Sequence, residues 1–570
     1  MIRTGAHRGD ELGAGAQDRR SLRGDLLPIA AIIVIWLATI LIVNPRGEFP
    51  LNDDWCYARS VYVLLHTGAL KFVPILTTTL VAQVLWGALF CLPFGFSFMA
   101  LRASTLILGL VGILAVYALL REIGAPRWVA VLGSLTVALN PIYFQLSNTF
   151  MTDVPFFAFG ALSIYAYLRG MRRESGAWIA VGVIFSLAAT LTRQLGIAIP
   201  IGFAAGYLAR NGVRRRNIAT AIAPVAIVLA ALLVYLKWLE FSGRLPEFFN
   251  KQAADAAEFL ASGFDNVIAG VAIVTRTALV YLGLFLFPFL ISTPGGHKSL
   301  PRRWEITNRL CAGALFAVIM GTLIAERKWM PLCGNCIGDF GLGPATLYDT
   351  GVFLLPNLPA APEWFWIVVT VVGALGAALV FHRILASVEM LFMRGSASSD
   401  ERAAIVMALA ISLLLLGAVA PLAKIAYYDR YFLFLMPVLM VMIVLTSRSL
   451  TTPSRALKLI GIAVLLIWGG VAVCGTHDYL AWNRARWKAL DDMMRNMRVP
   501  IERIEGGYEF DGWYRIREDS GPDWQFFRSE DYIVTFGPVY DYDELRRYEY
   551  RRWMPPRKDY IYVLRGAGVE

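Results

Sequence analysis

Charged residues are scarce in this chain. Asp, Glu, Lys and Arg account for 17% of its 570 residues, whereas about a quarter is usual for a soluble domain. Hydrophobic residues account for 57%, and many windows exceed the ~20 apolar residues that cross a bilayer. This composition excludes a soluble protein and predicts one that crosses the membrane many times.

Cysteine is also scarce, and no signal for removal of the N-terminus is evident. Cys333 and Cys336 form a lone Cys-x-x-Cys pair, which could be a disulfide or half of a metal site. Without a second pair, we predict no metal at this motif. The apolar segment 26–43 is followed by no Ala-x-Ala cleavage site, so we expect it to remain as the first span.

Positive charge is concentrated in every second loop. The formal net charge is +11, and Arg and Lys gather within 19–23, 121–127, 169–173, 210–216, 298–303, 383–402 and 448–458. The positive-inside rule places these segments, and with them the N-terminus, in the cytoplasm. Because this distribution accounts for the positive charge, no nucleic-acid partner is predicted.

The fold class predicted from these patterns is mainly α, a membrane bundle of about 13 helices. The expected spans are 26–44, 98–120, 127–146, 153–169, 177–191, 194–209, 218–237, 275–292, 308–325, 363–382, 403–422, 431–447 and 457–474. The apolar stretch 76–94 is not counted, because a crossing there would move every later Arg cluster to the outside. We expect it to be interfacial or re-entrant, ended by Pro93 and Gly95.

Three regions follow from the composition. Residues 1–25 are polar and rich in Gly and Arg, and are predicted to be disordered. Residues 26–475 form the transmembrane domain. Residues 476–570 are predicted to form a small α/β domain outside the membrane, with a helix at 480–497 and strands at 532–536 and 560–564.

Two adjacent carboxylates, Asp53 and Asp54, follow the first span. Ionised groups near hydrocarbon are costly unless they are solvated or used. The next residues, 55–66, have the pattern of a helix on the membrane surface. The acids could therefore be a helix cap, stabilised by the helix dipole, or part of a reaction site.

Other charged residues lie at the outer ends of predicted spans. They are the carboxylates Asp153 and Asp429 and the cations Arg102, Arg193, Arg276, Lys424 and Arg430. A carboxylate among cations can take a proton from an acceptor hydroxyl while the cations hold a phosphate. The alternatives are that Arg102 and Arg276 snorkel, that Asp153 starts a helix, and that Arg430 pairs with Asp429.

Two further stretches carry no decisive motif. The Gly-rich loop 329–344 could approach a substrate, although a structural linker is the preferred interpretation. The segment 505–513 combines acids and aromatics, which suits sugar stacking and an ordinary turn equally well.

Four motifs carry a resemblance to a known family. Asn52-Asp53-Asp54-Trp55-Cys56-Tyr57-Ala58-Arg59 resembles the first outer loop of GT-C glycosyltransferases, in particular the bacterial family 39-like set, which is similar to protein O-mannosyltransferases and lipid A aminoarabinose transferases. Phe150-Met151-Thr152-Asp153-Val154-Pro155-Phe156 is similar to the family's second acidic loop. Leu191-Thr192-Arg193-Gln194 and Asp429-Arg430-Tyr431 match its break between short spans and its Arg-Tyr motif. The resemblance covers about residues 26–475.

The resemblance implies inverting transfer of a sugar from a polyprenyl-phosphate donor to a protein, lipid or glycan acceptor, at the outer face of the bacterial cytoplasmic membrane. It implies catalytic roles for Asp53, Asp54 and Asp153. It also implies that the lipid phosphate is held by Arg193, Arg430, Arg102, Lys424 and Arg276. The family usually has Glu where this chain has Asp54, so the base remains open between the two adjacent acids. Like charges disfavour joint ionisation of this pair.

Two other functions remain as alternatives, a flippase or transporter of lipid-linked sugars and a non-catalytic assembly subunit. Transporters usually contain internal repeats and polar residues at mid-span. This chain has no convincing repeat, and its charges lie at span ends. The expected partners are a lipid-linked sugar, its acceptor and membrane lipids; no cofactor is predicted, and a need for a divalent metal is left open.

Overall fold

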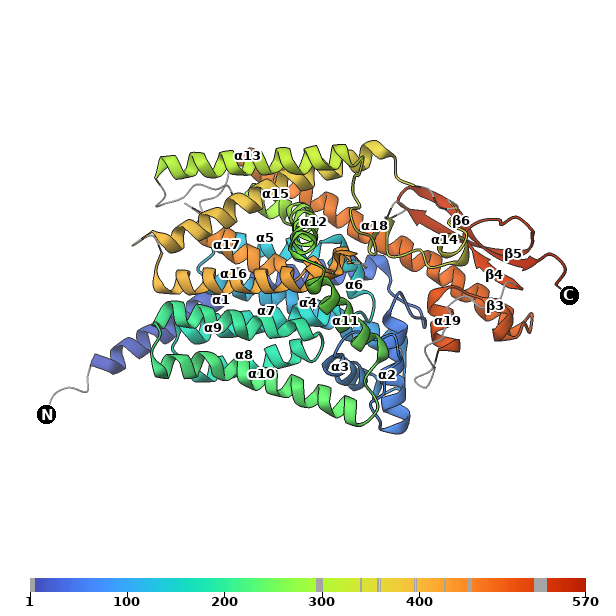
Figure 1. The fold of residues 1–570 in the computed structure, drawn as a ribbon, viewed down its shortest axis with the longest axis horizontal. Coiled ribbons are helices and arrows are strands. Elements are labelled where there is room, and N and C mark those ends of the chain that lie inside the picture. Colours follow the sequence, from blue (N-terminus) through green and yellow to red (C-terminus); the bar gives the residue numbers. More distant parts are fainter. Residues whose placement is uncertain are drawn as a thin grey trace.

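Long apolar helices form most of the structure. The computed structural model describes residues 6–293, 301–338, 341–355, 358, 360–393, 395, 397–424, 427–447, 454–516 and 531–569. The bundle comprises α1 (Ala6–Val43), α4 (Phe98–Glu122), α5 (Arg127–Ala138), α6 (Pro141–Ser147), α7 (Asp153–Arg172), α8 (Gly176–Thr190), α9 (Ala198–Asn211), α10 (Arg215–Phe241), α12 (Phe264–Ser292), α13 (Arg302–Ala325), α15 (Glu363–Phe392), α16 (Ser399–Val419), α17 (Leu435–Thr446) and α18 (Arg455–Arg495). Most of the long helices run roughly side by side, whereas α12 is seen nearly end-on (Figure 1).

The number of spans is smaller than the sequence predicts. Within the described ranges, ten helical stretches are long and apolar enough to span, or eleven if α5 and α6, bent by 63°, count as one. The predicted spans 177–191 and 194–209 correspond to α8 and α9, which have 15 and 14 residues. A crossing needs ~20 residues. The two helices are short because the α-helix is interrupted between them. The polar residues Thr192 and Arg193 are not helical, and the 3₁₀ turn η1 (Gln194–Ile197) leads into α9.

Helix also extends into the segment 1–25 that was predicted to be disordered. Residues 1–5 lie outside the described part of the chain, and α1 begins at Ala6. Extending an existing helix by one residue costs far less free energy than nucleating a new helix. The helix of an apolar span can therefore continue into the polar residues that precede it.

Two short helices lie across one end of the bundle, beside the small domain (Figure 1). They are α2 (Asp54–Thr67) and α3 (Val81–Cys91). We call this the outer end, because the sequence predicts that it faces outward. With 11 residues, α3 is too short to cross a bilayer, and it exposes Leu85 and Leu89 as an interfacial helix would. A third short helix, α11 (Glu247–Ala261), contacts α12.

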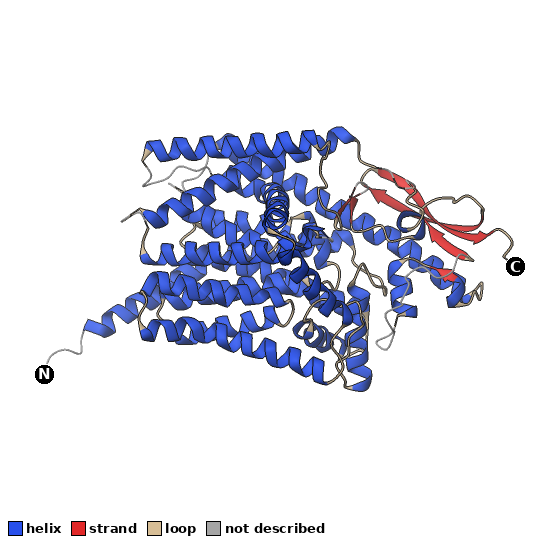
Figure 2. Cartoon of the chain, viewed as in Figure 1, coloured by secondary structure: helices blue, strands red, loops and turns tan. Residues whose placement is uncertain are grey.

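The C-terminal region is a small mixed domain built on the end of α18. It contains β3 (Ile504–Glu505), α19 (Tyr508–Arg515), β4 (Tyr532–Thr535), β5 (Tyr542–Trp553) and β6 (Pro556–Gly566), with strand order β3-β4-β6-β5 (Figure 2). The two predicted strands lie on β4 and β6. The predicted helix 480–497 is the outer part of α18, which passes without interruption through the proposed domain boundary at 475/476.

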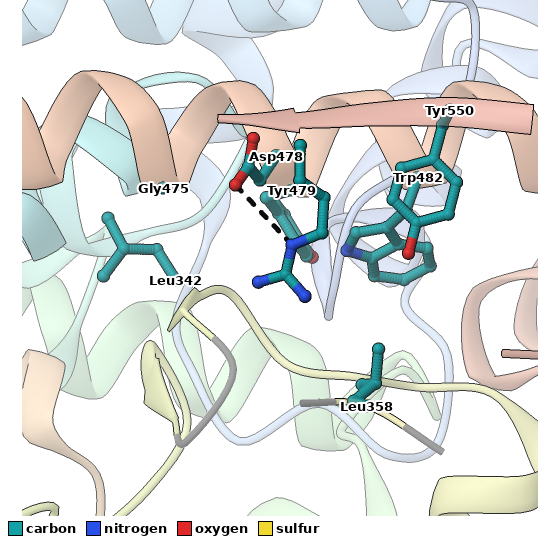
Figure 3. A pocket seen from close by; sticks show the side chains of 8 residues that line it. Leu342, Leu358, Gly475, Asp478, Tyr479, Trp482 and Tyr550 are labelled. Carbon is teal, nitrogen blue, oxygen red and sulfur yellow. Dashed lines mark ion pairs between the residues drawn. The ribbon is translucent and has the colours of Figure 1, made fainter. Parts of the chain in front are cut away.

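This domain is fastened to α18 through Asp478. The carboxylate accepts hydrogen bonds from the backbone N–H groups of Trp553 and Met554 at 2.7 and 2.9 Å, and pairs with Arg552 at 3.8 Å. Figure 3 shows the small pocket at this junction, where α18 and Tyr550 face the loop around Leu342. The turn between β5 and β6 is therefore held against the helix that emerges from the bundle, and this fixes the domain over the outer end.

Candidate active site

Asp53 begins the candidate site. It occupies the N-cap position of α2, yet its side chain makes no capping hydrogen bond. Instead, Oδ1 accepts a hydrogen bond of 2.8 Å from the Tyr508 hydroxyl, and Oδ2 lies 3.1 Å from Arg430 Nη2. The side chain remains 26% exposed. The carboxylate is thus held by two donors and still reaches solvent, which is not the environment of a simple cap.

Asp54 points the other way. It is 2% exposed, and its two oxygens accept from the N–H groups of Leu51 and Phe150 at 2.6 and 3.1 Å. Burial raises the pKa of Asp54 to about 8, because the charged form loses its hydration. This side chain ties the first outer loop to the loop before α7. Of the two adjacent acids, Asp53 is therefore the one that a substrate can reach.

Asp153 lies beside both arginines that the sequence singles out. It is the first residue of α7; Oδ1 is 2.9 Å from Arg193 Nη1 and Oδ2 is 3.8 Å from Arg430 Nε. Arg193 Nε also donates to Thr152 Oγ1 at 2.9 Å. Both arginines and Asp153 are buried. Buried charges are tolerated only in such mutually compensating groups. We call Asp53, Asp153, Arg193 and Arg430 the outer charge cluster.

Arg430 links the cluster to the rest of the outer end. Its Nη1 donates to Asn335 Oδ1 at 2.5 Å, and its guanidinium carbon lies 4.8 Å from the centre of the Tyr428 ring, a cation–π distance. Asp429 is not its ion-pair partner, because that carboxylate accepts from the backbone N–H groups of Cys336, Ile337 and Arg430. Asp429 thus holds the loop that contains Asn335 against the 3₁₀ turn η3 (Asp429–Phe432).

Two of the other three predicted phosphate-binding cations, Arg102 and Arg276, do not join the outer charge cluster. Arg102 is 1% exposed and donates to the backbone oxygens of Pro45, Gly47 and Phe49 at 2.5, 3.1 and 3.1 Å. It neither snorkels nor faces the cluster, because these carbonyls in the first outer loop occupy its guanidinium. Arg276 forms an ion pair with Glu326 at 2.6 Å. The side chain of Lys424 lies outside the described residues.

Sequence reasoning missed several residues that complete the site. Asn335, on the loop interpreted as a linker, accepts from both Arg430 and Asn52 Nδ2, the latter at 3.2 Å. Tyr508 and Glu509 come from 505–513, which forms α19 rather than a turn. Tyr508 reaches Asp53, and Glu509 Oε1 accepts from Asn52 N at 2.8 Å. The available signals were the four glycines of the first stretch and the acids and aromatics of the second.

A metal centre is not evident within the described ranges. No group of three or more His, Cys, Asp or Glu side chains is arranged there to hold an ion. The thiols of Cys333 and Cys336 are both free. The backbone N–H of Cys336 donates a hydrogen bond to Asp429, so the contact that this motif makes to the site comes from its backbone and not from a thiol.

Comparison with known proteins shows that part of the chain is similar to enzymes that transfer sugars. A family profile described as dolichyl-phosphate-mannose-protein mannosyltransferase matches residues 79–239, which include Asp153 and Arg193. The chain is similar to the GT-C glycosyltransferases. The profile does not extend to Asp53 or Arg430, which join the matched segment only in the folded structure. A comparison with curated protein sequences gave no match.

The solved structures to which this chain is similar share little sequence with it. An oligosaccharyltransferase from Archaeoglobus fulgidus is 17% identical over 82% of this chain and 57% of its own, with a TM-score of 0.38. ArnT from Cupriavidus metallidurans, bound to undecaprenyl phosphate, is 13% identical over 85% and 84%, with a TM-score of 0.35. The protein O-mannosyltransferase Pmt1-Pmt2 complex of S. cerevisiae is 16% identical over 38% and 34%, with a TM-score of 0.31. The chain thus spans about a third of the yeast protein and just over half of the archaeal one.

Proposed function

We propose that this protein is an integral-membrane glycosyltransferase that moves a sugar from a polyprenyl-phosphate donor to an acceptor hydroxyl. The observation that carries the proposal is the position of Asp53. It is a partly exposed carboxylate at the outer end, 3.1 Å from a guanidinium that also approaches Asp153. A base beside fixed cations is what removal of a proton and departure of a phosphate require.

In the proposed reaction, the acceptor oxygen attacks the anomeric carbon from the face opposite the phosphate. Asp53 takes the hydroxyl proton as the new glycosidic bond forms. The bond from the anomeric carbon to the phosphate oxygen breaks, and the polyprenyl phosphate leaves with its electron pair. A single displacement of this kind inverts the anomeric configuration.

The arginines stabilise the negative charge that grows on the leaving phosphate. Arginine presents five N–H donors in a planar fork that matches a phosphate. Arg193 uses Nε and Nη1 on Thr152 and Asp153, so its Nη2 is the donor assigned to the phosphate. Asp153 keeps both guanidinium groups in place, which makes it a positioning residue in this mechanism.

The donor class is supported by the family profile. Dolichyl-phosphate mannose is a sugar linked to a polyprenyl phosphate, and the profile covers the segment that supplies Asp153 and Arg193. The outer face is supported by the distribution of Arg and Lys, which are concentrated in the loops at the opposite end. We extend the proposal to the outer face of the bacterial cytoplasmic membrane, with the C-terminal domain outside.

The test is a transfer assay with the purified full-length protein in liposomes. Radiolabelled polyprenyl-phosphate sugars are supplied with candidate protein, lipid and glycan acceptors. We expect Asp53→Asn to lower transfer by about 10²- to 10⁴-fold, the usual contribution of a general base. Asp265→Asn, at an exposed acid near the start of α12, is the control and should transfer normally.

Three outcomes would overturn the proposal. A folded Asp53→Asn variant with full transfer would remove the base. Retention of the donor's anomeric configuration would exclude a single displacement. Movement of the lipid-linked sugar across the liposome without covalent transfer would identify a flippase. Parallel assays with EDTA test our prediction that no divalent metal is needed.

A further inference from the structure

The C-terminal domain contacts the proposed base directly. Tyr508, the first residue of α19, donates a hydrogen bond of 2.8 Å to Asp53 Oδ1 across 455 positions of sequence. The other oxygen of Asp53 faces Arg430 Nη2. We infer that Tyr508 is a positioning residue for Asp53, and that the C-terminal domain thereby completes the active site. This inference rests on the proposed function and assigns a part of the site to a second domain.

The Tyr508 ring is held in place by a buried tryptophan. Its edge packs against Trp55, with ring centres 6.0 Å apart and planes inclined by 75°. Trp55 is fully buried and is covered by Gly512 of α19, where an added Cβ would lie 2.3 Å from the indole. The hydroxyl therefore reaches Asp53 from a rigid support, and its bond selects one orientation of the carboxylate.

A second, buried set of hydrogen bonds, made by Glu509, fixes the position of α19 relative to the first outer loop. Glu509 Oε1 accepts from Asn52 N at 2.8 Å, while Oε2 accepts from Arg486 Nη1 and Thr346 Oγ1, both at 2.7 Å. The side chains of Glu509 and Arg486 are both 0% exposed. The residue before Asp53 is thus held by α19, and α19 is held by α18. A shift of the domain would break both connections at once.

The turn into α19 has no room for a side chain at Gly507. Gly507 has φ +89°, a conformation that side chains disfavour, and a Cβ there would lie 2.4 Å from Thr346 O. Only glycine lets the chain pass this closely and still present Tyr508 and Glu509 to the first outer loop. The loop after α13 that carries Thr346 also carries Asn335, which accepts a hydrogen bond from Arg430. Both donors to Asp53, Tyr508 and Arg430, therefore contact this loop.

A phenol suits this task because it donates without adding charge. Burial, together with the nearby Asp53 carboxylate, raises the pKa of Tyr508 well above its usual value, so the hydroxyl keeps its proton. Besides Tyr508, the titratable groups near Asp53 include Arg430, Cys56, Tyr57 and Tyr428. Among them, Arg430 and Tyr508 supply the hydrogen bonds to the carboxylate, and a hydrogen bond to a carboxylate favours its charged form.

The test is Tyr508→Phe in the full-length protein, which deletes one oxygen and keeps the ring. We expect kcat to fall about tenfold, which corresponds to one ordinary hydrogen bond, with the KM of the donor unchanged. The acid limb of the pH profile of kcat should move to higher pH, because one donor to the ionised carboxylate is lost. Tyr514→Phe, on the same helix and 38% exposed, is the matched control and should show neither change.

The Asp53→Asn background separates positioning from a general structural role. If Tyr508 acts through Asp53, adding Tyr508→Phe to Asp53→Asn should cost almost nothing more, whereas independent effects would multiply. Wild-type kcat and an unmoved pH profile in Tyr508→Phe, while Asp53→Asn is inactive, would overturn this inference and leave the proposed function standing. A faster variant would also overturn it, since the phenol would then be occupying the acceptor's place. Full activity in Asp53→Asn would instead remove the proposed function itself.

Discussion

Arg430 Nη2 lies 3.1 Å from Asp53 Oδ2, although the two residues are 377 positions apart in sequence. The same guanidinium is 3.8 Å from Asp153 and donates to Asn335. One side chain thus joins the loop before α2, the start of α7 and the loop after α13. The outer charge cluster is a single electrostatic unit, and its members should respond to substitution together.

The first prediction concerns the fork geometry of Arg430. Arg430→Lys keeps the charge but cannot bond Asn335, Asp53 and Asp153 together, because an ammonium is a compact donor without the planar fork. We expect kcat to fall about 10²-fold, a typical cost of displaced catalytic geometry, while the protein stays folded. The matched control is Arg276→Lys, whose arginine pairs with Glu326. Equal activity of the two variants would contradict the role of the fork.

A second prediction concerns the buried pair of Arg193 and Asp153, whose charged atoms are 2.9 Å apart. Arg193→Gln leaves Asp153 buried with only the longer contact to Arg430, and we expect a loss of up to about 3 kcal/mol in the free energy of unfolding. Adding Asp153→Asn removes the uncompensated charge and should recover part of that loss. Thermal unfolding of both single variants and the double variant measures the coupling. Additive losses would show that the two side chains do not stabilise each other.

A third prediction follows from the burial of Asp54. Its pKa is about 8 in the folded protein and 3.8 as an ordinary value, so between these pH values the folded state binds the extra proton. The stability of the wild type should therefore fall as pH rises through this window and level off above it, by at most about 1.4 kcal/mol per pH unit. Asn cannot titrate, so the stability of Asp54→Asn should lack the part of the pH dependence that comes from Asp54.

The comparison of unfolding temperatures tests that sign. Relative to the wild type, Asp54→Asn should become more stable between about pH 5 and about pH 8, because only the wild type is destabilised over this range. Asp265→Asn, at an exposed acid, should keep a constant difference from the wild type. A difference for Asp54→Asn that does not change with pH would rule out the raised pKa.

The charged part of the site could be read from the sequence because charge is costly where these residues lie. Asp53, Asp153, Arg193 and Arg430 all lie at the ends of apolar segments, where an ion needs water or a partner. The structure brings these four together. Local sequence could not decide between Asp53 and Asp54, since the two differ in the direction of their side chains and not in chemistry.

The neutral part of the site could not be read in the same way. Asn335 and Tyr508 carry no charge that demands an explanation, and they lie 283 and 455 positions from the first-loop residues that they contact. The placement of Tyr508 depends on how the C-terminal domain sits on α18, and that of Asn335 on the loop after α13, which Asp429 holds. That helix was predicted in two pieces because composition changes near residue 475, although helix propagation does not require constant polarity.

The missed strand has a similar cause. β5 has the sequence Tyr-Asp-Glu-Leu-Arg-Arg-Tyr-Glu-Tyr-Arg-Arg-Trp, and most of its residues are at least partly exposed. Without alternating apolar residues it lacks the usual signal of a half-buried strand. Its pairing with β6 along its whole length supplies the stability that its own pattern does not indicate.

The final prediction separates two roles for Arg102. If it held the donor's phosphate, Arg102→Gln would raise the KM of the donor. Its three backbone acceptors at Pro45, Gly47 and Phe49 instead predict a structural loss, because the carbonyls of the loop before Asp53 lose buried donors at about 1–3 kcal/mol each. We expect a lower unfolding temperature and a lower kcat with the donor KM unchanged. Arg46→Gln, at an exposed arginine of the same loop, is the control and should match the wild type. A stable Arg102→Gln variant with a raised donor KM would return Arg102 to the phosphate site.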